Sequence, residues 1–151
     1  MYEFISKELG VITLFKDGAH TTYLKTNTLS FKSPNPENWP YHWPNFLTDY
    51  KLLYETLPKI DCGELLWEKT GIYCDTTKTD HLLSRTVEQI KEYKIKDVSA
   101  STIKAFKKLE DKSQRIILVD KHGNDLIFYL SLLNEKWYLT IIDRATSDCS
   151  G

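Results

Sequence analysis

The chain has 151 residues, of which 41% are hydrophobic and 27% charged, which is the size and composition of one globular domain spanning residues 1–151. Twenty basic side chains, 17 of them lysine, stand against twenty-one acidic ones, so neither the net charge nor the residue choice favours a nucleic-acid partner. No apolar run reaches the roughly 20 residues that a membrane span requires.

The first recognisable element is a pair of extended runs within residues 9–31. The runs LGVITLF and TTYLKTNTLSF are joined through a segment that begins with Lys16, Asp17 and Gly18. An Asp-Gly pair between two β-rich runs is a strong hairpin signal, and it predicts an N-terminal β-hairpin. The proline-containing run SPNPENWP that follows cannot continue a sheet, because proline has no backbone donor, and is predicted to be a loop.

The middle of the chain predicts helices. Apolar residues at helical spacing predict an amphipathic helix over 46–57, capped by Asn45 and ended by Pro58. A second helix is predicted from Thr79 or Asp80 to about Lys94. Between them, residues 60–74 are interpreted as a short strand or turn pair, and residues 99–111 fit a short helix or an extended edge equally well.

The last third of the sequence predicts three antiparallel strands, RIILVD, DLIFYLSLL and WYLTIID, joined by two tight turns. Strand alternation places Trp137, Leu139 and Ile141 on one face of the last strand. The other face of this sheet carries Tyr129, Tyr138 and Ile142 among others, so the sheet is expected to be partly covered there too. The tail after Asp143 is polar and is expected to fray.

The run 134-NEKWYLTIID-143, preceded by amphipathic helices, resembles the closing sheet of the nuclear transport factor two-like (SnoaL-like) superfamily. Within that superfamily it is most similar to uncharacterised lipoprotein-type domains of Bacteroidetes. The resemblance covers about the last 40 residues, and Glu135 stands where the family often has glycine. It implies a cone-shaped α+β fold, in which a curved, mainly antiparallel sheet packs on two or three helices, here with an added N-terminal hairpin.

The resemblance also implies where an active site would lie. In catalytic members an acid inside the cone takes a proton from a carbon next to a carbonyl, helped by a tyrosine or a second acid. The candidates for this role are Asp143, Asp61, Tyr129 and Tyr138. The alternative is that Asp143 forms an ordinary surface pair with Arg144.

Other reactive side chains are better explained as structural. Cys74, Asp75, Asp80 and His81 lack the spacing of a metal site, so the acids are interpreted as turn or cap residues and His81 as a solvated residue. Likewise, Asp120, His122 and Asp125 surround a hairpin loop. We therefore expect neither a metal nor a cofactor.

Three cysteines, Cys62, Cys74 and Cys149, are an odd number, which argues against a disulfide framework and favours a reducing compartment. A bridge between Cys62 and Cys74 is the alternative, and it would contribute roughly 3 kcal/mol. Acids at Glu3 and Glu8 replace a basic leader. The chain is expected to be cytoplasmic as written, or exported or lipid-anchored if a signal peptide has been removed.

The aromatic segment 38-NWPYHWPNF-46 is the strongest candidate for binding. The candidate binding residues are Trp39, Tyr41, His42, Trp43 and Phe46. Aromatic rings on a proline-stiffened loop are typical of interfaces, but the same rings can close the end of a small core. The sequence thus favours a non-enzymatic module that binds a protein or a small apolar ligand, or forms a homodimer through the face of Tyr129, Tyr138 and Ile142. A small cone-fold enzyme and an immunity or inhibitor protein are the alternatives.

Overall fold

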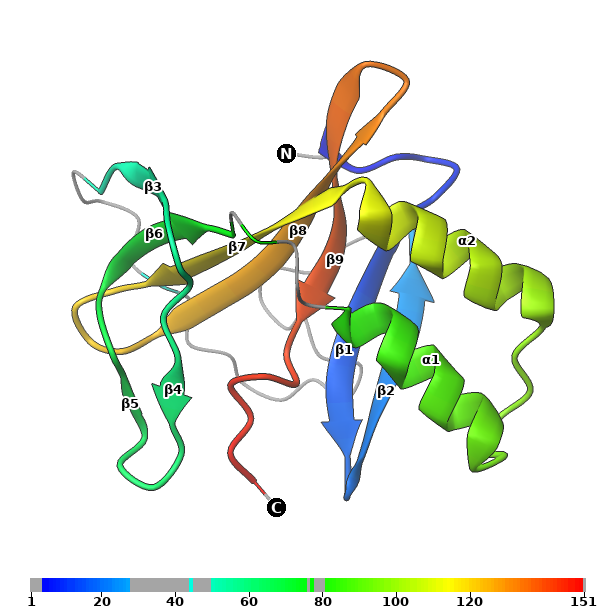
Figure 1. Cartoon of the computed structure of the whole chain (residues 1–151), viewed down its shortest axis with the longest axis horizontal. Coiled ribbons are helices and arrows are strands. Elements are labelled where there is room, and N and C mark those ends of the chain that lie inside the picture. The colour runs from blue at the N-terminus through cyan, green and yellow to red at the C-terminus, as the bar shows by residue number, and fades with distance from the viewer. Residues whose placement is uncertain (1–3, 28–43, 45–49, 76, 78–80, 151) are drawn as a thin grey trace.

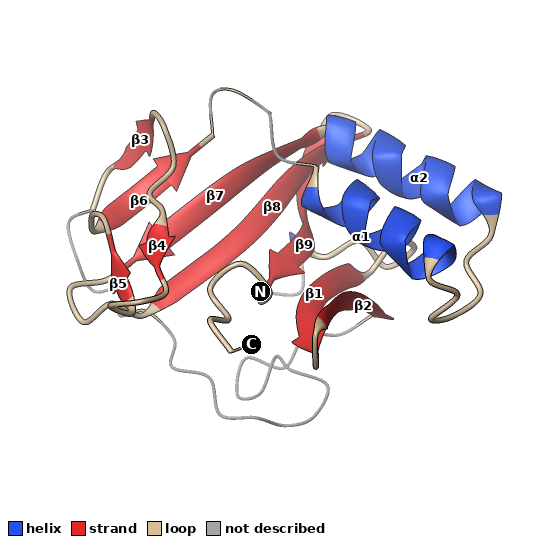
Figure 2. Ribbon diagram, turned by 60° about the horizontal axis from the view of Figure 1, so that its bottom comes forward, coloured by secondary structure: helices blue, strands red, loops and turns tan. Residues whose placement is uncertain are grey.

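The computed structural model describes residues 4–27, 44, 50–75, 77 and 81–150. In these residues a curved, mostly antiparallel sheet carries two helices side by side on one face (Figures 1 and 2). This is the predicted α+β class. No helix among the described residues has both the length and the apolar character needed to cross a membrane.

The described residues form a seven-stranded sheet of order β2-β1-β9-β8-β7-β6-β3 and a separate pair, β4-β5. The strands are β1 (Val11–Asp17), β2 (His20–Thr26), β3 (Leu52–Tyr54), β4 (Ile60–Asp61), β5 (Leu66–Trp67), β6 (Gly71–Cys74), β7 (Ser113–Val119), β8 (Asp125–Leu133) and β9 (Lys136–Asp143). The helices are α1 (Leu82–Glu92) and α2 (Ala100–Asp111). Neighbouring strands run antiparallel except β1 with β9 and β3 with β6, which are parallel.

The N-terminal strands β1 and β2 pair in antiparallel register, with Gly18 and Ala19 between the last partners, Asp17 and His20. Gly18 has φ +62°, a conformation that favours glycine in tight turns. The first residues of β1 are buried because β1 lies between β2 and β9.

The C-terminal meander of β7, β8 and β9 confirms the three predicted strands. The predicted face of the last strand is wrong, because a β-bulge shifts the register: Tyr129 pairs with Ile141, but Leu130 pairs with Leu139, which leaves Thr140 as the extra residue. Ile141 therefore packs in the helix-covered cluster, while Leu139 packs against the cluster on the opposite face.

The helix α1 buries the apolar stripe that its periodicity indicated. In α1 the buried residues include Leu83, Val87 and Ile90, which confirms the helix predicted up to about Lys94; its predicted caps, Thr79 and Asp80, lie outside the described residues. The segment 99–111 is a helix, α2, and the Ser99 side chain caps it by accepting a hydrogen bond from the Thr102 backbone N–H at 3.1 Å.

The helix predicted over 46–57 is wrong. Residues 45–49 lie outside the described part of the chain, and Leu52–Tyr54 form β3, which pairs in parallel with β6. The side chains of Leu52, Leu53 and Tyr54 are exposed, so the apolar spacing did not report a buried stripe. The free edge of β6 offers these residues a backbone ladder, and such tertiary pairing overrides helical periodicity.

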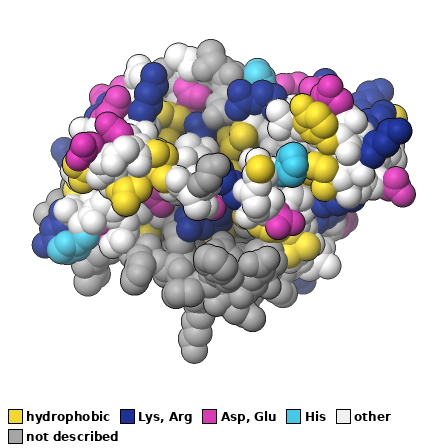
Figure 3. All heavy atoms as spheres, turned by 90° about the horizontal axis from the view of Figure 1, so that it is seen from below, with side chains coloured by type: hydrophobic (Ala, Val, Ile, Leu, Met, Phe, Trp, Pro, Cys, Tyr) yellow, Lys and Arg dark blue, Asp and Glu magenta, His cyan; other side chains and the backbone are white. Residues whose placement is uncertain are grey.

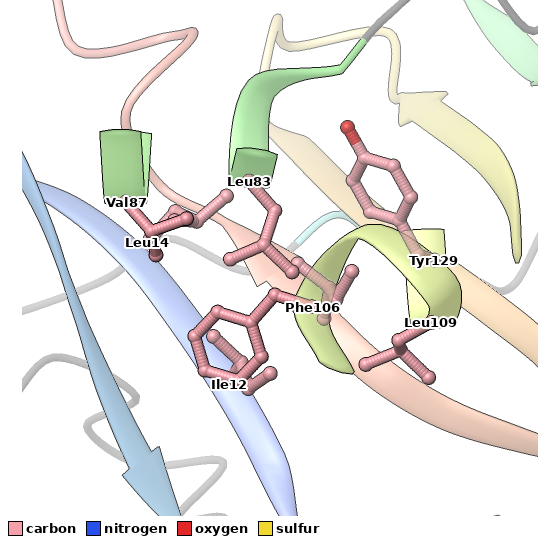
Figure 4. Packing of buried hydrophobic residues seen from close by; sticks show 8 residues of the cluster. Ile12, Leu14, Leu83, Val87, Phe106, Leu109 and Tyr129 are labelled. Carbon is pink, nitrogen blue, oxygen red and sulfur yellow. The ribbon is translucent and has the colours of Figure 1, made fainter. Parts of the chain in front are cut away.

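The main core lies between the sheet and the helices. Ile12 and Leu14 of β1 meet Leu83 and Val87 of α1, while Phe106 and Leu109 of α2 close the cluster beside Tyr129 (Figure 4). Alternate residues of the same strands point to the opposite face, where Ile142 packs with Val11 and Ile5.

The cysteines form a disulfide that the sequence did not predict. Cys62, in the turn between β4 and β5, forms a disulfide with Cys149 across 87 residues of sequence, and Cys74 is the buried free thiol. The C-terminal tail is held in place by this disulfide and by a hydrogen bond, because Lys16 donates to the Asp148 carbonyl at 2.5 Å. The expectation of a fraying tail therefore fails for the described residues up to Ser150.

Candidate functional site

The described residues form a small polar pocket and a larger open groove. The first is a polar pocket of about 70 Å³ beside the start of α1. Its lining residues are Asp75, His81, Glu110, Asp111, Ser113, Arg115 and Tyr129. Figure 4 shows that the ring of Tyr129 belongs to the core while its hydroxyl points out of the cluster. Acids, an imidazole and a phenol are the groups that proton-transfer chemistry uses. Whether they are free for such chemistry depends on the hydrogen bonds that they already make.

Glu110 is the most buried acid of this pocket, and its carboxylate binds the start of α1. Its Oε2 accepts a hydrogen bond from the backbone N–H of Leu83 at 2.8 Å, and its Oε1 accepts from the hydroxyl of Ser84 at 2.6 Å. The N-cap residue of α1 is His81, which makes no side-chain capping bond of its own. Glu110 therefore supplies the cap from a different helix and compensates the positive end of the α1 dipole.

His81 was predicted to be a solvated residue, but the structure shows it exposed on one side and in contact with an acid on the other. Its side chain is 55% exposed, and its Nδ1 lies 3.6 Å from the Glu110 carboxylate. The imidazole thus covers the outer side of the buried acid.

Asp143 is fully buried behind Arg115, and its oxygen atoms are saturated. Oδ1 accepts from the backbone N–H groups of Ala145 and Thr146, both at 2.9 Å. Oδ2 accepts from Arg115 Nη2 at 2.9 Å and from the Thr146 hydroxyl at 2.5 Å. The four lone-pair sites of a carboxylate are thereby used, so Asp143 anchors the chain after β9 and has no site left to take a proton from a substrate.

The surface pair expected between Asp143 and Arg144 is wrong. Arg144 Nη1 instead lies 3.7 Å from Asp125 Oδ1, and Asp143 pairs with Arg115. The reason is strand alternation: adjacent residues at the end of β9 point to opposite faces and so meet different partners.

The remaining catalytic candidates do not meet. Asp61 is exposed, and its Oδ1 accepts from the backbone N–H groups of Gly63 and Glu64, so it shapes the turn after β4. Tyr129 lines the polar pocket, whereas Tyr138 lines a different cavity. The homodimer face predicted from Tyr129, Tyr138 and Ile142 also fails, because Tyr129 and Ile142 are buried in clusters on opposite faces of the sheet.

The turn residues behave as predicted. Asp75 Oδ1 accepts from the backbone N–H and the hydroxyl of Thr77, both at 2.8 Å. Asp120 Oδ1 accepts from the N–H groups of His122 and Asn124, which shapes the loop before β8. In the described part of the chain no group of three or more His, Cys, Asp or Glu side chains is arranged to hold a metal.

Cys74 is a buried thiol rather than a nucleophile. Its Sγ lies 3.1 Å from Gln114 Oε1, to which it donates a hydrogen bond. Burial raises the pKa of the Cys74 thiol, and the nearby Asp75 carboxylate raises it further. A thiol held neutral in this way is a poor nucleophile.

The aromatic binding residues Trp39, Tyr41, His42, Trp43 and Phe46 lie outside the described residues. Whether they form a binding surface or close the core stays a prediction.

The second concave region is an open groove of about 940 Å³, which we call the lysine groove. It is lined by Ile5, Ser6, Lys7, Glu8, Leu9, Ala105, Lys108, Leu109, Lys112, Leu133, Asn134, Lys136 and Tyr138. One wall is the C-terminal half of α2, and the other walls are the segment before β1 and the β8–β9 turn, which meet at the top of the molecule in Figure 1.

The floor of the lysine groove is apolar and continuous with the core. Leu109 belongs to the main core cluster, and Leu9 and Leu133 pack against it. The rim is basic, because Lys7, Lys108, Lys112 and Lys136 are all exposed there, against one acid, Glu8. Within the described residues none of these four ammonium groups has a carboxylate within 4 Å.

Part of this rim has a structural role as well. Lys108 lies in the last turn of α2, where a positive charge interacts favourably with the helix dipole. That role does not extend to Lys7 or Lys136, which belong to other segments. By contrast, basic and acidic side chains are interspersed on the face of the molecule seen in Figure 3. The one-sided charge of the groove is thus a local feature of a chain with net charge −1.

Sequence reasoning missed the lysine groove. The available signal was the spacing of Ala105, Lys108, Leu109 and Lys112, which places small, apolar and basic positions on one helical face. That signal was hidden because residues 99–111 fitted a strand equally well. Lys7 and Lys136 lie far away in sequence, so only the fold brings them to the same rim.

Comparison of the chain with protein-family models, with curated proteins and with solved structures finds no match.

Proposed function

We propose that the protein is a non-enzymatic interaction module that binds an anionic, partly apolar segment of a partner protein in the lysine groove. One observation carries the proposal: exposed ammonium groups without carboxylate partners among the described residues surround an apolar floor. An apolar centre with a polar rim is the usual anatomy of a protein interface.

The charge arrangement supports an anionic partner. Four lysines on one rim repel one another, and a partner with carboxylates would relieve that repulsion. Rim charges of this kind mainly accelerate association and discriminate against wrongly charged partners, while the apolar floor supplies most of the affinity. The binding is therefore expected to weaken with salt.

The enzymatic alternative has less support. It requires an acid in an enclosed apolar cavity, whereas Asp143 is saturated by Arg115, Ala145 and Thr146. Asp61 is an exposed turn residue. No observation in the described residues favours an acid acting on a carbonyl compound.

The resemblance to the nuclear transport factor two-like superfamily stays part of this proposal. The curved sheet, the helices on one face and the closing meander β7–β8–β9 support it. Members of the superfamily usually open with helices, whereas here both helices follow β6, and the early strand β1 pairs in parallel with β9. If the fold is such a cone, the cluster of Leu83, Val87 and Phe106 fills its interior, and the lysine groove lies at its mouth.

Selection from a displayed random-peptide library tests the proposed function. The baits are the wild-type chain, the groove variant Lys108→Glu/Lys112→Glu, and the control Lys91→Glu/Lys121→Glu. The control changes the net charge equally at exposed lysines outside the groove, and Lys91 matches Lys108 in occupying the last turn of a helix.

We expect the wild-type and control chains to enrich peptides rich in Asp, Glu and large apolar residues, and the groove variant to lose this enrichment. Equal enrichment on all three chains would place binding outside the groove. If no bait enriches any sequence family, the proposal of an interaction module fails.

A further inference from the structure

The shape of the lysine groove points to one conformation of partner. Resting on the proposed function, we infer that its occupant is an amphipathic helix of a partner protein, with apolar residues facing the floor and acidic residues on both flanks.

The volume suits about two helical turns. A helix about 10–12 Å across and about 11 Å long occupies roughly 800 to 1,200 Å³. The groove has a volume of about 940 Å³. A segment of this size can place two or three apolar side chains on the floor formed by Leu9, Leu109 and Leu133.

The wall formed by α2 is suited to helix packing. Ala105 and Leu109 lie one turn apart on its groove side, and Lys108 and Lys112 flank them. The small side chain of Ala105 permits the close approach of a second helix axis, at the lower end of the roughly 8–10 Å range. Lys108 and Lys112 are separated by about 6 Å along the helix axis, so the partner flank that faces them needs acids three or four residues apart.

The strand edges beside the lysine groove are poorly suited to bind a partner segment in extended conformation. An added strand needs a regular row of free backbone N–H and C=O groups. β8 is paired on both sides, with β7 and β9, over most of its length. β9 pairs with β1 only from Ile141 onwards, and the edge before it is interrupted by the bulge at Thr140. A helical partner does not need such an edge, because its backbone N–H and C=O groups form hydrogen bonds within the helix.

The lysines also argue against compact anions and membranes. They come from three separate segments, those of Lys7, Lys108 with Lys112, and Lys136, and surround an apolar floor instead of converging on one point. The groove lining contains no arginine, the residue whose planar fork binds phosphate bidentately. A membrane surface requires apolar side chains that project outward, whereas those of the groove lie on a concave floor.

The test uses a labelled peptide of about 18 residues with a leucine stripe at helical spacing and glutamates on both flanks. A second peptide of the same length carries two central prolines at positions outside the leucine stripe and the glutamates, which prevents helix formation. A third has lysines in place of the glutamates. Laurate, vesicles of anionic phospholipid and inorganic phosphate are the other probes.

Fluorescence anisotropy measures peptide binding to the full chain, to Lys108→Glu/Lys112→Glu and to Lys91→Glu/Lys121→Glu. We expect the glutamate peptide to bind the wild-type and control chains at least about tenfold more tightly than the groove variant, with affinity falling about tenfold between roughly 50 and 300 mM salt. The proline and lysine peptides should bind at least about tenfold more weakly.

If the groove variant does not fold, Lys7→Glu/Lys136→Glu, with both substitutions on the opposite walls, replaces it. Equal binding of the proline peptide overturns the helical occupant but leaves the groove as a binding site. Lysine-dependent binding of laurate, vesicles or phosphate without binding of the peptide also overturns this inference and shows a groove for other anions. If no probe binds in a lysine-dependent manner, this inference fails, and the displayed-library selection decides separately whether the proposed function fails with it.

Discussion

The carboxylate of Glu110 accepts a hydrogen bond from the hydroxyl of Ser84 at 2.6 Å, although the two residues belong to different helices. Glu110 lies near the C-terminal end of α2, and Ser84 in the first turn of α1. A buried acid thus caps one helix from another, and the two helices are expected to fold as one unit.

Replacing Glu110 by Ala should lower the free energy of unfolding by about 2–3 kcal/mol, because it removes a helix cap and leaves buried N–H groups unpaired. Ser84→Ala is the matched control and should cost about 1 kcal/mol, since it removes a single hydrogen bond. Urea unfolding followed by circular dichroism gives both values. A loss no larger for Glu110→Ala than for Ser84→Ala would contradict the capping role.

Asp143→Asn should lower the unfolding free energy by about 3–5 kcal/mol, because it leaves the Arg115 guanidinium buried without its carboxylate and points an amide NH₂ at N–H donors. The Arg115 side chain is 10% exposed in the structure. The control Asp61→Asn replaces an exposed turn acid and should cost about 1 kcal/mol or less. Equal midpoints of urea unfolding for the two variants would show that the buried pair contributes little.

The parts of the fold that the sequence predicted are those set by local patterns. The strands of the meander β7–β8–β9 follow from β-rich runs bounded by turns, and the helix α1 follows from apolar residues at helical spacing. The bulge at Thr140, which changes the faces of β9, follows from no such pattern. Leu52–Tyr54 show the limit of that reasoning, because their apolar spacing was helical while the edge of β6 made them a strand.

The site was harder to predict because its contacts span long stretches of sequence. Glu110 meets Ser84 26 residues away, and Asp143 meets Arg115 28 residues away. The other partners of Asp143, Ala145 and Thr146, lie two and three residues further along the chain. Lys7 and Lys136 reach one rim through the packing of the segment before β1 on the sheet. A sequence pattern identifies which side chains carry charge, but only the fold decides which charges are left without an oppositely charged partner.

The disulfide between Cys62 and Cys149 closes a long loop, so its loss should destabilise the chain strongly. Cys149→Ser is expected to lower the unfolding free energy by roughly 4–5 kcal/mol through the entropy of the unfolded chain. Cys74→Ser, the control, should change it by about 1 kcal/mol or less, because Ser can keep the hydrogen bond to Gln114. Peptide mapping without reductant identifies the bridge directly, and a Cys62–Cys74 peptide would contradict the structure.

Thiol titration tests the burial of Cys74. Because burial raises the pKa of this thiol, the native chain should react slowly with an aromatic disulfide reagent at about pH 8, and unfolding without reductant should release one reactive thiol. The raised pKa of Cys74 also makes stability depend on pH. The neutral thiol contributes stability below its unfolded pKa of about 8.5, and this contribution is lost as the pH rises through the higher folded pKa. Stability should therefore decline above about pH 8.5 in the wild type, and less so in Cys74→Ser. Rapid reaction of the native chain would show that Cys74 is accessible.

The turn between β8 and β9 offers a stabilising substitution. Asn134 and Glu135 both have positive φ, 50° and 67°, as the two central residues of a type I′ turn require. Asparagine tolerates this region, but glutamate is strained there, so Glu135→Gly should raise the free energy of unfolding by about 0.5–1 kcal/mol. Asn134→Gly, the matched control, should be nearly neutral. Urea unfolding of both variants measures the difference, and a loss of stability in Glu135→Gly would mean that contacts of the Glu135 side chain outweigh the strain of its backbone.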